Sequence, residues 1–531
     1  MHQSHLHFRP QRVLAGLMIT GMLSVTAAHS MAEDDSPMWR RNTHGGPVAG
    51  EPTLVDPQMT EATRLWISEA DIPPGRRGSG DDGRHRDGLV DMERPAAGGF
   101  GSPIAAAGKV FQYHYRPSGA LYDAPRARGL GMSQEELQAQ QPEMTGNLVR
   151  GHERWLISAT DVITAMDAET GKTAWQTDLT DQGLNRAFFG KGGGGLTPAY
   201  HDGMLIAMAS NAQIFGLDAE TGEILWTYEG LWRHQQMVEY RRQAIEGDLF
   251  APRFNRDMLF GLVAADGLVV INDMRWHRVQ QRSGTTYHYD TMNSYVALDV
   301  RTGEERWTVP EVGSANSTPK LVTIDGKTYV LAVSIFHLTL IDLETGEQIW
   351  QSDEGHQSRT CDFNLGVSDQ YVVMSARQRG VDGRRFNAYR IGLDGLHKLW
   401  TWGPIREWRS NALILGDVGY IHFQGNLRAF NMENGEVLAE VPIGDIRPAG
   451  GSPFLTSYGG WIFSRARGYG EEGLDGMFVF RADPSQLAES KRFFQMDTAQ
   501  PYYCLIFPAF ANSTLFMRTD FSNKMEAYRL R

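Results

Sequence analysis

Cysteine is almost missing from this sequence, because its 531 residues include only Cys361 and Cys504. Neither cysteine lies in a C-x-x-C or C-x-x-C-H pattern, which excludes an attached haem and a thiolate zinc site. Two cysteines do not make a disulfide framework, and the sequence leaves open whether they pair with each other.

A basic excess is also missing. The chain has 51 Lys and Arg against 63 Asp and Glu, a net charge of −12, so the overall charge does not indicate nucleic-acid binding. No H-E-x-x-H pattern, paired His and carboxylate spacing or nucleophile elbow occurs, and we predict no metal site. The glycine run at 190–198 lacks the G-K-[ST] ending of a phosphate-binding loop.

Long apolar runs are absent apart from one near the N-terminus. Arg9 and Arg12 precede the apolar residues 13–28, and the small residues of 29–32 offer a cleavage site. The run is shorter than the ~20 residues that cross a bilayer. We therefore predict a cleavable signal peptide over 1–32 and a periplasmic or secreted protein that does not span the membrane. No cysteine lies near the end of this run, so we do not expect lipid attachment.

A ten-residue string is repeated in the chain, and its clearest copy is "LDAETGEILW". Each copy has Asp second, Thr-Gly in the middle and Trp last, and the copies lie at 166–175, 217–226, 298–307 and 341–350. Two weaker copies follow at 391–400 and 430–439, the second with Ala439 in place of Trp. A spacing of roughly 40–50 residues, with one insertion, is typical of a four-stranded propeller blade.

The unit around the second copy predicts four strands separated by turn residues, at 197–200, 204–209, 213–218 and 224–228. Eight such units occur, and their first strands are expected near Ser102, Thr197, Asn255, Ser317, Asp362, Ser410, Ser452 and Pro508. The last unit has only three strands, and residues 62–70 supply a fourth. We predict an all-β, eight-bladed propeller over 62–531, after an extension at 33–61, whose N-terminal strand completes the C-terminal blade.

The repeat resembles that of the PQQ-like, or quinoprotein-type, propeller family. The resemblance implies the fold and assigns Asp218 and Trp226 to architecture. It leaves the activity open, because the family includes quinone-dependent dehydrogenases and cofactor-free scaffolds of outer-membrane assembly. The dehydrogenases bind PQQ with calcium, and many have two adjacent cysteines, which this chain lacks. The membrane-anchored assembly members carry a lipidated cysteine, which is also absent.

By analogy with other propellers, the connections between second and third strands surround a central funnel, the default ligand site. Alignment of the second strands by their apolar residues places six polar residues at one shared position: Arg116, Asn211, Arg275, Arg377, Asn426 and Arg467. Guanidinium groups bind carboxylate, sulfate or phosphate, so this ring predicts an anionic ligand. The alternative is that these arginines pair with neighbouring acidic residues.

Three insertions are expected on the same face, at 117–155, 231–254 and 275–290, and the second includes a helix around 234–246. They and an equivalent turn contain aromatic and histidine residues that suit a saccharide: Trp232, Trp276, His277, Tyr287 and His337. For an acidic saccharide, β-elimination would use His277, Tyr287 or His337 as acid and base. The alternative is that the insertion residues pack against one another.

Three functions therefore remain open. The first is binding of an anionic small molecule or acidic glycan, with lyase-type processing. The second is a cofactor-free periplasmic scaffold with a protein partner, and the third is a PQQ-dependent alcohol or sugar dehydrogenase with calcium. Thermal unfolding with uronate oligomers, or with quinone and calcium, would distinguish them.

Overall fold

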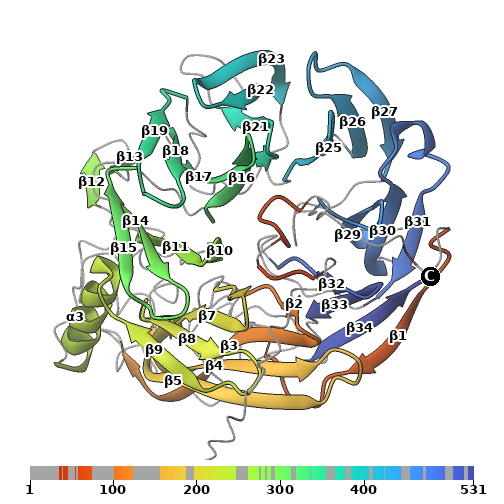
Figure 1. The fold of residues 1–531 in the computed structure, drawn as a ribbon. Coiled ribbons are helices and arrows are strands. Elements are labelled where there is room, and N and C mark those ends of the chain that lie inside the picture. The colour runs from red at the N-terminus through yellow and green to blue at the C-terminus, as the bar shows by residue number, and fades with distance from the viewer. Residues whose placement is uncertain are drawn as a thin grey trace, which may run out of the picture.

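The chain forms eight four-stranded antiparallel sheets, arranged as blades around a common axis (Figure 1). This confirms the predicted eight-bladed, all-β propeller. The computed structural model describes residues 35–38, 40–45, 54, 58–73, 101–122, 156–186, 196–246, 261–273, 277–281, 284–288, 294–312, 318–334, 337–354, 365–376, 384–405, 411–423, 425–443, 455–469, 474–496, 506–518 and 524–531.

In each blade the strands run outward from the axis in chain order, except at the closure. Blades 1 and 2 consist of β2 (Ile104–Ala106), β3 (Lys109–Tyr122), β4 (Leu156–Asp167), β5 (Thr173–Arg186), β6 (Ala199–His201), β7 (Met204–Met208), β8 (Ile214–Asp218) and β9 (Ile224–Tyr228). Blades 3 and 4 consist of β10 (Val263–Ala265), β11 (Leu268–Asp273), β14 (Ser294–Asp299), β15 (Glu305–Pro310), β16 (Lys320–Ile324), β17 (Lys327–Val333), β18 (Leu338–Asp342) and β19 (Gln348–Gln351).

The second half of the ring continues the pattern. Blades 5 and 6 consist of β20 (Leu365–Val367), β21 (Tyr371–Ala376), β22 (Arg384–Gly392), β23 (Gly395–Ile405), β24 (Leu413–Leu415), β25 (Val418–Phe423), β26 (Asn426–Asn431) and β27 (Val437–Pro442). Blades 7 and 8 consist of β28 (Leu455–Tyr458), β29 (Trp461–Tyr469), β30 (Leu474–Arg481), β31 (Arg492–Gln495), β32 (Ala509–Ala511), β33 (Thr514–Arg518), β34 (Met525–Leu530) and β1 (Ala62–Ile67).

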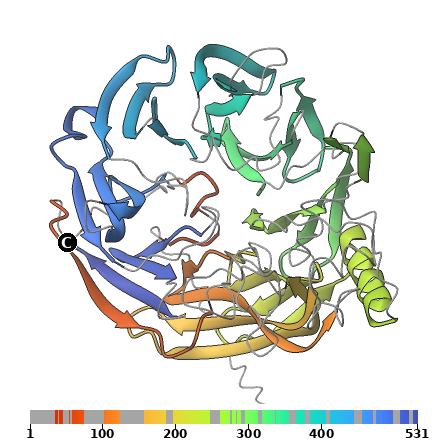
Figure 2. The ribbon, with the colours of Figure 1, turned by 180° about the vertical axis from the view of Figure 1, so that it is seen from behind.

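The ring closes as predicted, because β1 pairs antiparallel with β34 and becomes the outer strand of blade 8 (Figure 2). The backbones of Glu61 and Arg531 exchange hydrogen bonds of 2.6 and 2.9 Å beside this pair. One expected strand start is wrong, since the first strand of blade 3 begins at Val263 rather than near Asn255. Residues 251–260 lie outside the described part of the chain.

Two elements occur inside predicted insertions. Helix α3 (Trp232–Glu246) confirms the helix expected around 234–246. Strands β12 (His277–Gln281) and β13 (Gly284–His288) form a two-stranded sheet in the third insertion, where no strands were predicted. A short 3-10 helix, η3 (Pro484–Gln486), follows β30. Among the described residues no helix is long and apolar enough to cross a bilayer.

The repeated string joins neighbouring blades, as the prediction for Asp218 and Trp226 states. Asp218 Oδ1 accepts the backbone N–H groups of Glu220 and Thr221 at 2.9 and 2.8 Å, which closes the turn. Trp226 Nε1 donates to the carbonyl of Val300 in the next blade at 3.0 Å. The same indole-to-carbonyl bond is made by Trp66, Trp175, Trp307, Trp350 and Trp400.

The seam between blades 6 and 7 is built differently, because Ala439 stands at the Trp position. There Lys491 Nζ donates to the carbonyl of Pro442 at 2.6 Å. The ammonium group of Lys491 also lies 5.1 Å from the centroid of the Phe478 ring. At this seam a cation of blade 7 therefore bonds to a carbonyl of blade 6.

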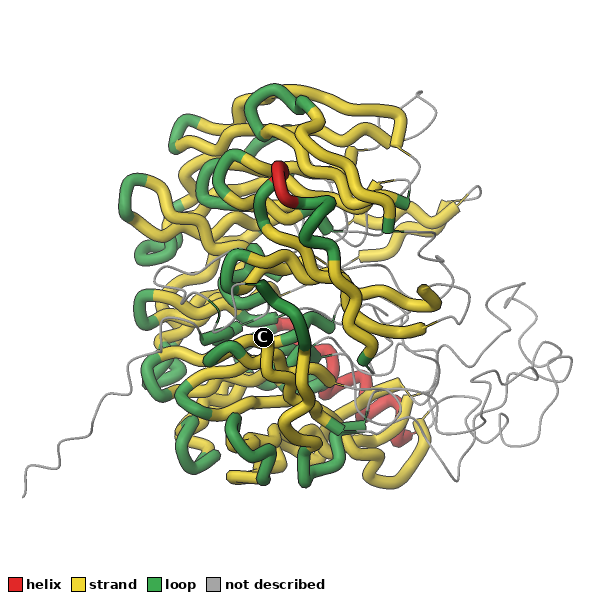
Figure 3. Tube along the Cα trace, turned by 90° about the vertical axis from the view of Figure 1, so that its right-hand side faces the viewer, coloured by secondary structure: helices red, strands yellow, loops and turns green. Residues whose placement is uncertain are grey.

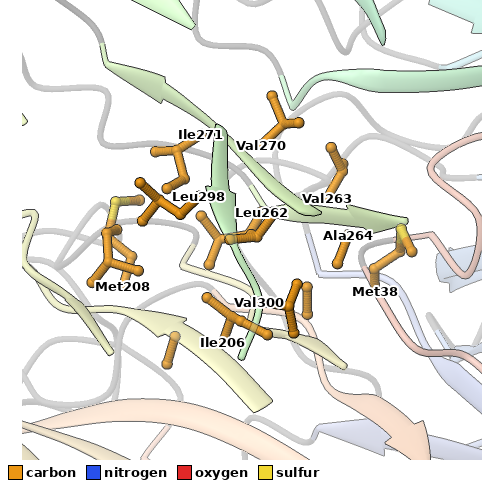
Figure 4. Packing of buried hydrophobic residues seen from close by; sticks show 14 of the residues in the cluster. Met38, Ile206, Met208, Leu262, Val263, Ala264, Val270, Ile271, Leu298 and Val300 are labelled. Atoms are coloured by element: carbon orange, nitrogen blue, oxygen red, sulfur yellow. The ribbon is translucent and has the colours of Figure 1, made fainter. Parts of the chain in front are cut away.

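The two faces of the disc differ. Figure 3 shows the tight turns of the blades gathered on one face, while α3 lies toward the other. The core lies between the blades, and the largest buried cluster joins side chains of blades 1 to 4. Met38, from the stretch before β1, belongs to this cluster and lies beside Ala264 of β10 (Figure 4). Residues that precede the first strand of the chain thus reach the centre of the ring.

Candidate functional site

Arg116, the first member of the predicted arginine ring, lies within β3, opposite Thr160 of β4, and not at the end of the strand as predicted, because β3 continues to Tyr122. Its Nη2 contacts both carboxylate oxygens of Asp178 on β5, at 2.5 and 2.7 Å. About half of each side chain is exposed, 48% and 56%, so the pair contributes little to stability. Arg116 therefore pairs with a neighbouring acidic residue, which was the alternative to binding an anionic ligand.

Of the six polar residues, the structure describes Arg116, Asn211, Asn426 and Arg467, and the predicted shared position is wrong for the last two. Lys109 and Trp461 are equivalent, because each pairs with the last residue of its first strand. Arg116 follows Lys109 by seven positions, whereas Arg467 follows Trp461 by six. Asn426 begins β26 instead of ending β25. The apolar pattern alone did not reveal these shifts, and a shift of one residue reverses the face of a strand.

Asn426 and Asn211 both make contacts within the chain. The Nδ2 group of Asn426 donates to Glu440 Oε1 at 2.7 Å. Asn211 is buried, and its Oδ1 accepts the backbone N–H of Gln213 at 3.0 Å. Neither contact excludes a ligand at these residues, and their assignment to an anion stays a prediction.

His337 is held by its own blade. Its backbone N–H donates to Ser334 Oγ at 2.8 Å, and its Nδ1 lies 3.0 Å from the carbonyl of Ser352. A carbonyl only accepts, so Nδ1 is the donor in this contact. A role of His337 as an acid or base stays a prediction.

The remaining site residues are placed only in part. His277 and Tyr287 lie on β12 and β13, opposite His288 and Arg278 in the backbone register. This hairpin brings the two backbones into one small sheet. Three others lie outside the described residues: Arg275, Trp276 and Arg377.

Trp232 begins α3, and the sequence analysis missed the residue that holds it. Asp273 of β11 accepts the backbone N–H groups of Trp232 and Arg233 at 3.0 and 3.1 Å, which caps the helix from another blade. His234 Nδ1 donates to the carbonyl of Asn211 at 2.9 Å. Burial lowers the pKa of Arg233 to about 10, although Asp273 acts in the opposite direction. Helix α3 is thus tied to blades 2 and 3.

A second buried carboxylate joins blades 1 and 2. Asp161 is fully buried and accepts hydrogen bonds from the hydroxyl of Tyr113, and from the N–H and hydroxyl of Ser210 at 3.1 and 2.7 Å. Gly183 leaves room for it, because a Cβ there would lie 2.5 Å from Asp161 Oδ2. The signal available in the sequence was an acidic residue in the interior of a strand.

Two buried histidines on second strands bond to hydroxyl groups. His114 Nε2 lies 3.0 Å from Thr164 Oγ1, and His422 Nε2 lies 2.6 Å from Ser464 Oγ. Burial lowers the pKa of both imidazoles to about 3, and for His114 the cation of Arg518 adds to the effect. Both rings are therefore neutral at physiological pH.

The axis of the ring holds residues 35–38 and 40–45, here called the axial segment (Figure 1). Ser36 forms an antiparallel bridge with Ala105 of β2, with N–H to carbonyl distances of 2.8 and 3.0 Å. The Ser36 hydroxyl donates to the carbonyl of Phe510 of β32 and accepts its N–H, both at 2.8 Å. The N–H of Tyr200 of β6 donates to the Pro37 carbonyl at 2.8 Å.

The axial segment also contacts the opposite side of the ring. The N–H of Ser457 on β28 donates to the Gly45 carbonyl at 2.7 Å, and the N–H of Leu321 on β16 donates to Thr43 Oγ1 at 3.1 Å. Arg40 reaches the carbonyl of Ala412, before β24, at 3.5 Å. The segment therefore bonds to the innermost part of six blades.

Two consecutive buried arginines belong to the axial segment. The Arg41 guanidinium donates to the Ser457 carbonyl at 3.0 Å and lies 4.9 Å from the ring centroid of Tyr458. The Arg40 guanidinium donates to the His44 carbonyl at 2.7 Å and lies 5.1 Å from the ring centroid of Phe507. Each guanidinium group thus contacts the face of an aromatic ring and donates to a carbonyl.

A family model described as "Outer membrane protein assembly factor BamB" matches residues 122–278 and 270–387, together half of the chain. The chain belongs to the PQQ-like propeller repeat family. The protein of that same description from Yersinia pestis is 23% identical over 296 residues, covering 52% of this chain and 58% of the relative. This PQQ-like propeller thus spans less than two thirds of that relative's length.

Solved structures resemble the PQQ-like propeller at low identity. BamB from Moraxella catarrhalis is 18% identical, with a TM-score of 0.37, over 59% of this chain and 78% of that chain. A europium-containing methanol dehydrogenase is 12% identical, with a TM-score of 0.39, over 82% of this chain and 90% of that chain. Quinohemoprotein alcohol dehydrogenase from Comamonas testosteroni is 13% identical, with a TM-score of 0.38, over 83% and 77%.

In the described part of the axis, the axial segment lies against the innermost strands of the ring. Among the described residues no group of three His, Cys, Asp or Glu side chains could hold a metal ion. The guanidinium groups of Arg40 and Arg41, which could meet a carboxylated quinone, donate to carbonyls of the chain itself. The described residues of the innermost strands contact the axial segment of the same chain.

Proposed function

We propose that this PQQ-like propeller is a protein-interaction scaffold that works outside the cytoplasm. One observation carries the proposal: the inner wall of the ring binds a stretch of polypeptide, the axial segment, through main-chain bonds on both sides of the axis. The printed name of the Yersinia pestis relative, an assembly factor, is consistent with such a role.

The geometry of the blades explains why polypeptide suits this wall. Each first strand pairs with its second strand only, so its free edge faces the axis. A free strand edge presents unpaired N–H and C=O groups and binds extended peptides by strand addition. The Ser36 bridge to Ala105 is one such contact.

The alternative of an acidic saccharide has less support. Arg116 already contacts Asp178, and Asn426 contacts Glu440, so an anionic ligand would have to compete with these carboxylates. The histidines His277 and His337 remain candidates without a second observation that joins them. Export by the predicted signal peptide 1–32 would place the axial segment near the new N-terminus.

The scaffold proposal is tested by photo-crosslinking in cells. A photoreactive residue replaces one exposed apolar side chain of an outer strand at a time: Leu65, Leu225 or Leu438, which are 41, 50 and 41% exposed. Asp394, on the turn face, is the control position. We expect a discrete protein adduct from at least one outer strand, absent with Asp394. No adduct at any position, together with a rise in Tm with uronate oligomers, would contradict the proposal.

A further inference from the structure

The axial segment is bound to the ring as a ligand would be. Its bonds join residues that are far apart in sequence, by 474 positions for Ser36 and Phe510, 416 for Arg41 and Ser457, and 278 for Thr43 and Leu321. The segment ends before the closing strand β1 begins. The pairing of β1 with β34 therefore closes the ring through separate contacts.

We propose that the inner wall is a binding site for a peptide segment that turns at two consecutive arginines, and that the axial segment occupies it in cis. The inference rests on the proposed function and names the class of partner: a segment of another protein with an Arg-Arg-x-Thr pattern. Such a segment replaces residues 40–43 at the axis.

Main-chain contacts alone do not select a sequence, but the side-chain contacts do. The Arg41 guanidinium lies against the Tyr458 ring and the Ser457 carbonyl, and Arg40 lies against the Phe507 ring. A planar guanidinium combines a stacking face with several donors, which a lysine ammonium does not. The wall therefore distinguishes an arginine pair from a lysine pair.

The hydroxyl of Thr43 adds a third point of recognition. It accepts the N–H of Leu321 on β16, on another side of the ring from Tyr458. Met38 belongs to the buried apolar cluster that also contains Ala264 of β10. The wall thus recognises an incoming segment through contacts with its two arginines, its threonine and its apolar residue.

The axial segment adopts a strained backbone conformation, and a partner segment with the same pattern pays the same cost. Arg40, Arg41 and Thr43 have φ values of 52°, 64° and 71°, in the left-handed region that side-chain-bearing residues disfavour. This strain weakens the binding of the segment relative to its contacts alone. The covalent tether compensates through a high effective concentration, which is why the site is occupied in cis.

The test compares the mature chain with a variant that lacks residues 33–45 and retains β1. The probe is a fluorescent synthetic peptide with the sequence of residues 33–47, and its binding is followed by anisotropy. We expect the truncated variant to bind the peptide at least 100-fold more tightly than the intact chain, since the tethered segment no longer competes. Peptides with both arginines changed to alanine or to lysine should bind at least 10-fold more weakly than the wild-type peptide.

A scrambled peptide of the same composition is the control for charge. Equal binding of the scrambled peptide, or no binding by a truncated variant with a native circular dichroism spectrum, would overturn the inference. If the truncated variant does not fold, the full chain with Arg40→Ala and Arg41→Ala takes its place. It should bind the wild-type peptide at least 10-fold more tightly than the unchanged chain, and equal binding would overturn the inference.

The two proposals fail in different ways. Peptide binding concerns the axis, whereas cross-linking from Leu65, Leu225 and Leu438 reports on outer strands. Adducts from outer strands without peptide binding would leave the scaffold proposal and reject the axial site.

Discussion

The indole of Trp226 lies directly over Gly303 of the next blade. A Cβ at Gly303 would come within 2.5 Å of Trp226 Cε3, and the glycine also has a φ of +72°. The Thr-Gly of the repeat is thus required twice, by the turn and by the indole of the preceding blade. The same relation joins Trp175 to Gly222 and Trp307 to Gly346.

This relation predicts the effect of Gly303→Ala. Gly267 provides a matched control, since its φ is +77° but a Cβ there meets nothing within 4 Å. We expect Gly267→Ala to cost about 1 kcal/mol of unfolding free energy from backbone strain alone. Gly303→Ala should cost about 1–3 kcal/mol more, because the indole must move. Urea denaturation of both variants measures the difference. Equal losses of unfolding free energy would show that the Trp226 indole does not restrict position 303.

Removal of the closing strand should expose an edge. A variant without residues 33–67 lacks β1 and leaves β34 with one unpaired side. We expect it to aggregate, because a free strand edge pairs with other chains. Light scattering during purification measures this, and the variant without 33–45 is the control that retains β1. A monodisperse product from the longer deletion would show that β1 is dispensable.

The buried carboxylate of Asp161 predicts a cost for Tyr113→Phe. The substitution removes one donor and leaves a fully buried acceptor with less compensation. We expect a loss of about 1–3 kcal/mol of unfolding free energy. Tyr228→Phe is the comparison, since that hydroxyl bonds to the exposed carboxylate of Glu305. A loss no larger than that of Tyr228→Phe would argue against a structural role for the network.

Stability should fall in mild acid because of three histidines. Burial lowers the pKa of His44, His114 and His422 from 6.5 to about 3. The folded pKa lies below the unfolded value, so the unfolded chain binds more protons, and stability present above pH 6.5 is lost as the pH falls toward 3. The slope is about 1.4 kcal/mol per pH unit for each histidine. Urea titrations at several pH values should show a smaller slope in His422→Gln, and an unchanged slope would contradict this account.

The anionic-ligand hypothesis has its own test. We expect no change in Tm with uronate oligomers, sulfated oligosaccharides, or quinone with calcium, because the scaffold proposal requires none of them. A rise in Tm with uronate that disappears in the variant with alanine at Arg275, Arg377 and Arg467 would instead support the predicted anionic ligand. Neutral glycans serve as the control.

The architecture was readable in the sequence because it depends on local, repeated chemistry. Asp218 closes its turn with residues two and three positions away, and Trp226 recurs with the period of the blades. Counting the units also showed that the last one needs a strand from 62–70. These features depend on neighbouring residues or on periodicity, which a single chain displays.

The arginine alignment shows where sequence patterns stop being sufficient. Arg467 and Asn426 were misplaced because apolar residues mark the middle of a strand and not its first residue. Side chains alternate along a strand, so an error of one position changes the face. The cap of α3 by Asp273 was missed because it joins residues 40 and 41 positions apart.

By itself, the sequence determined the number of blades, the turn that each Asp closes, the clamp that each Trp makes and the strand that closes the ring. The tertiary structure alone decided what occupies the axis. Ser36 and Phe510, or Arg41 and Ser457, meet only when the ring has closed, because their contacts depend on the radial arrangement of all eight blades and follow no local period.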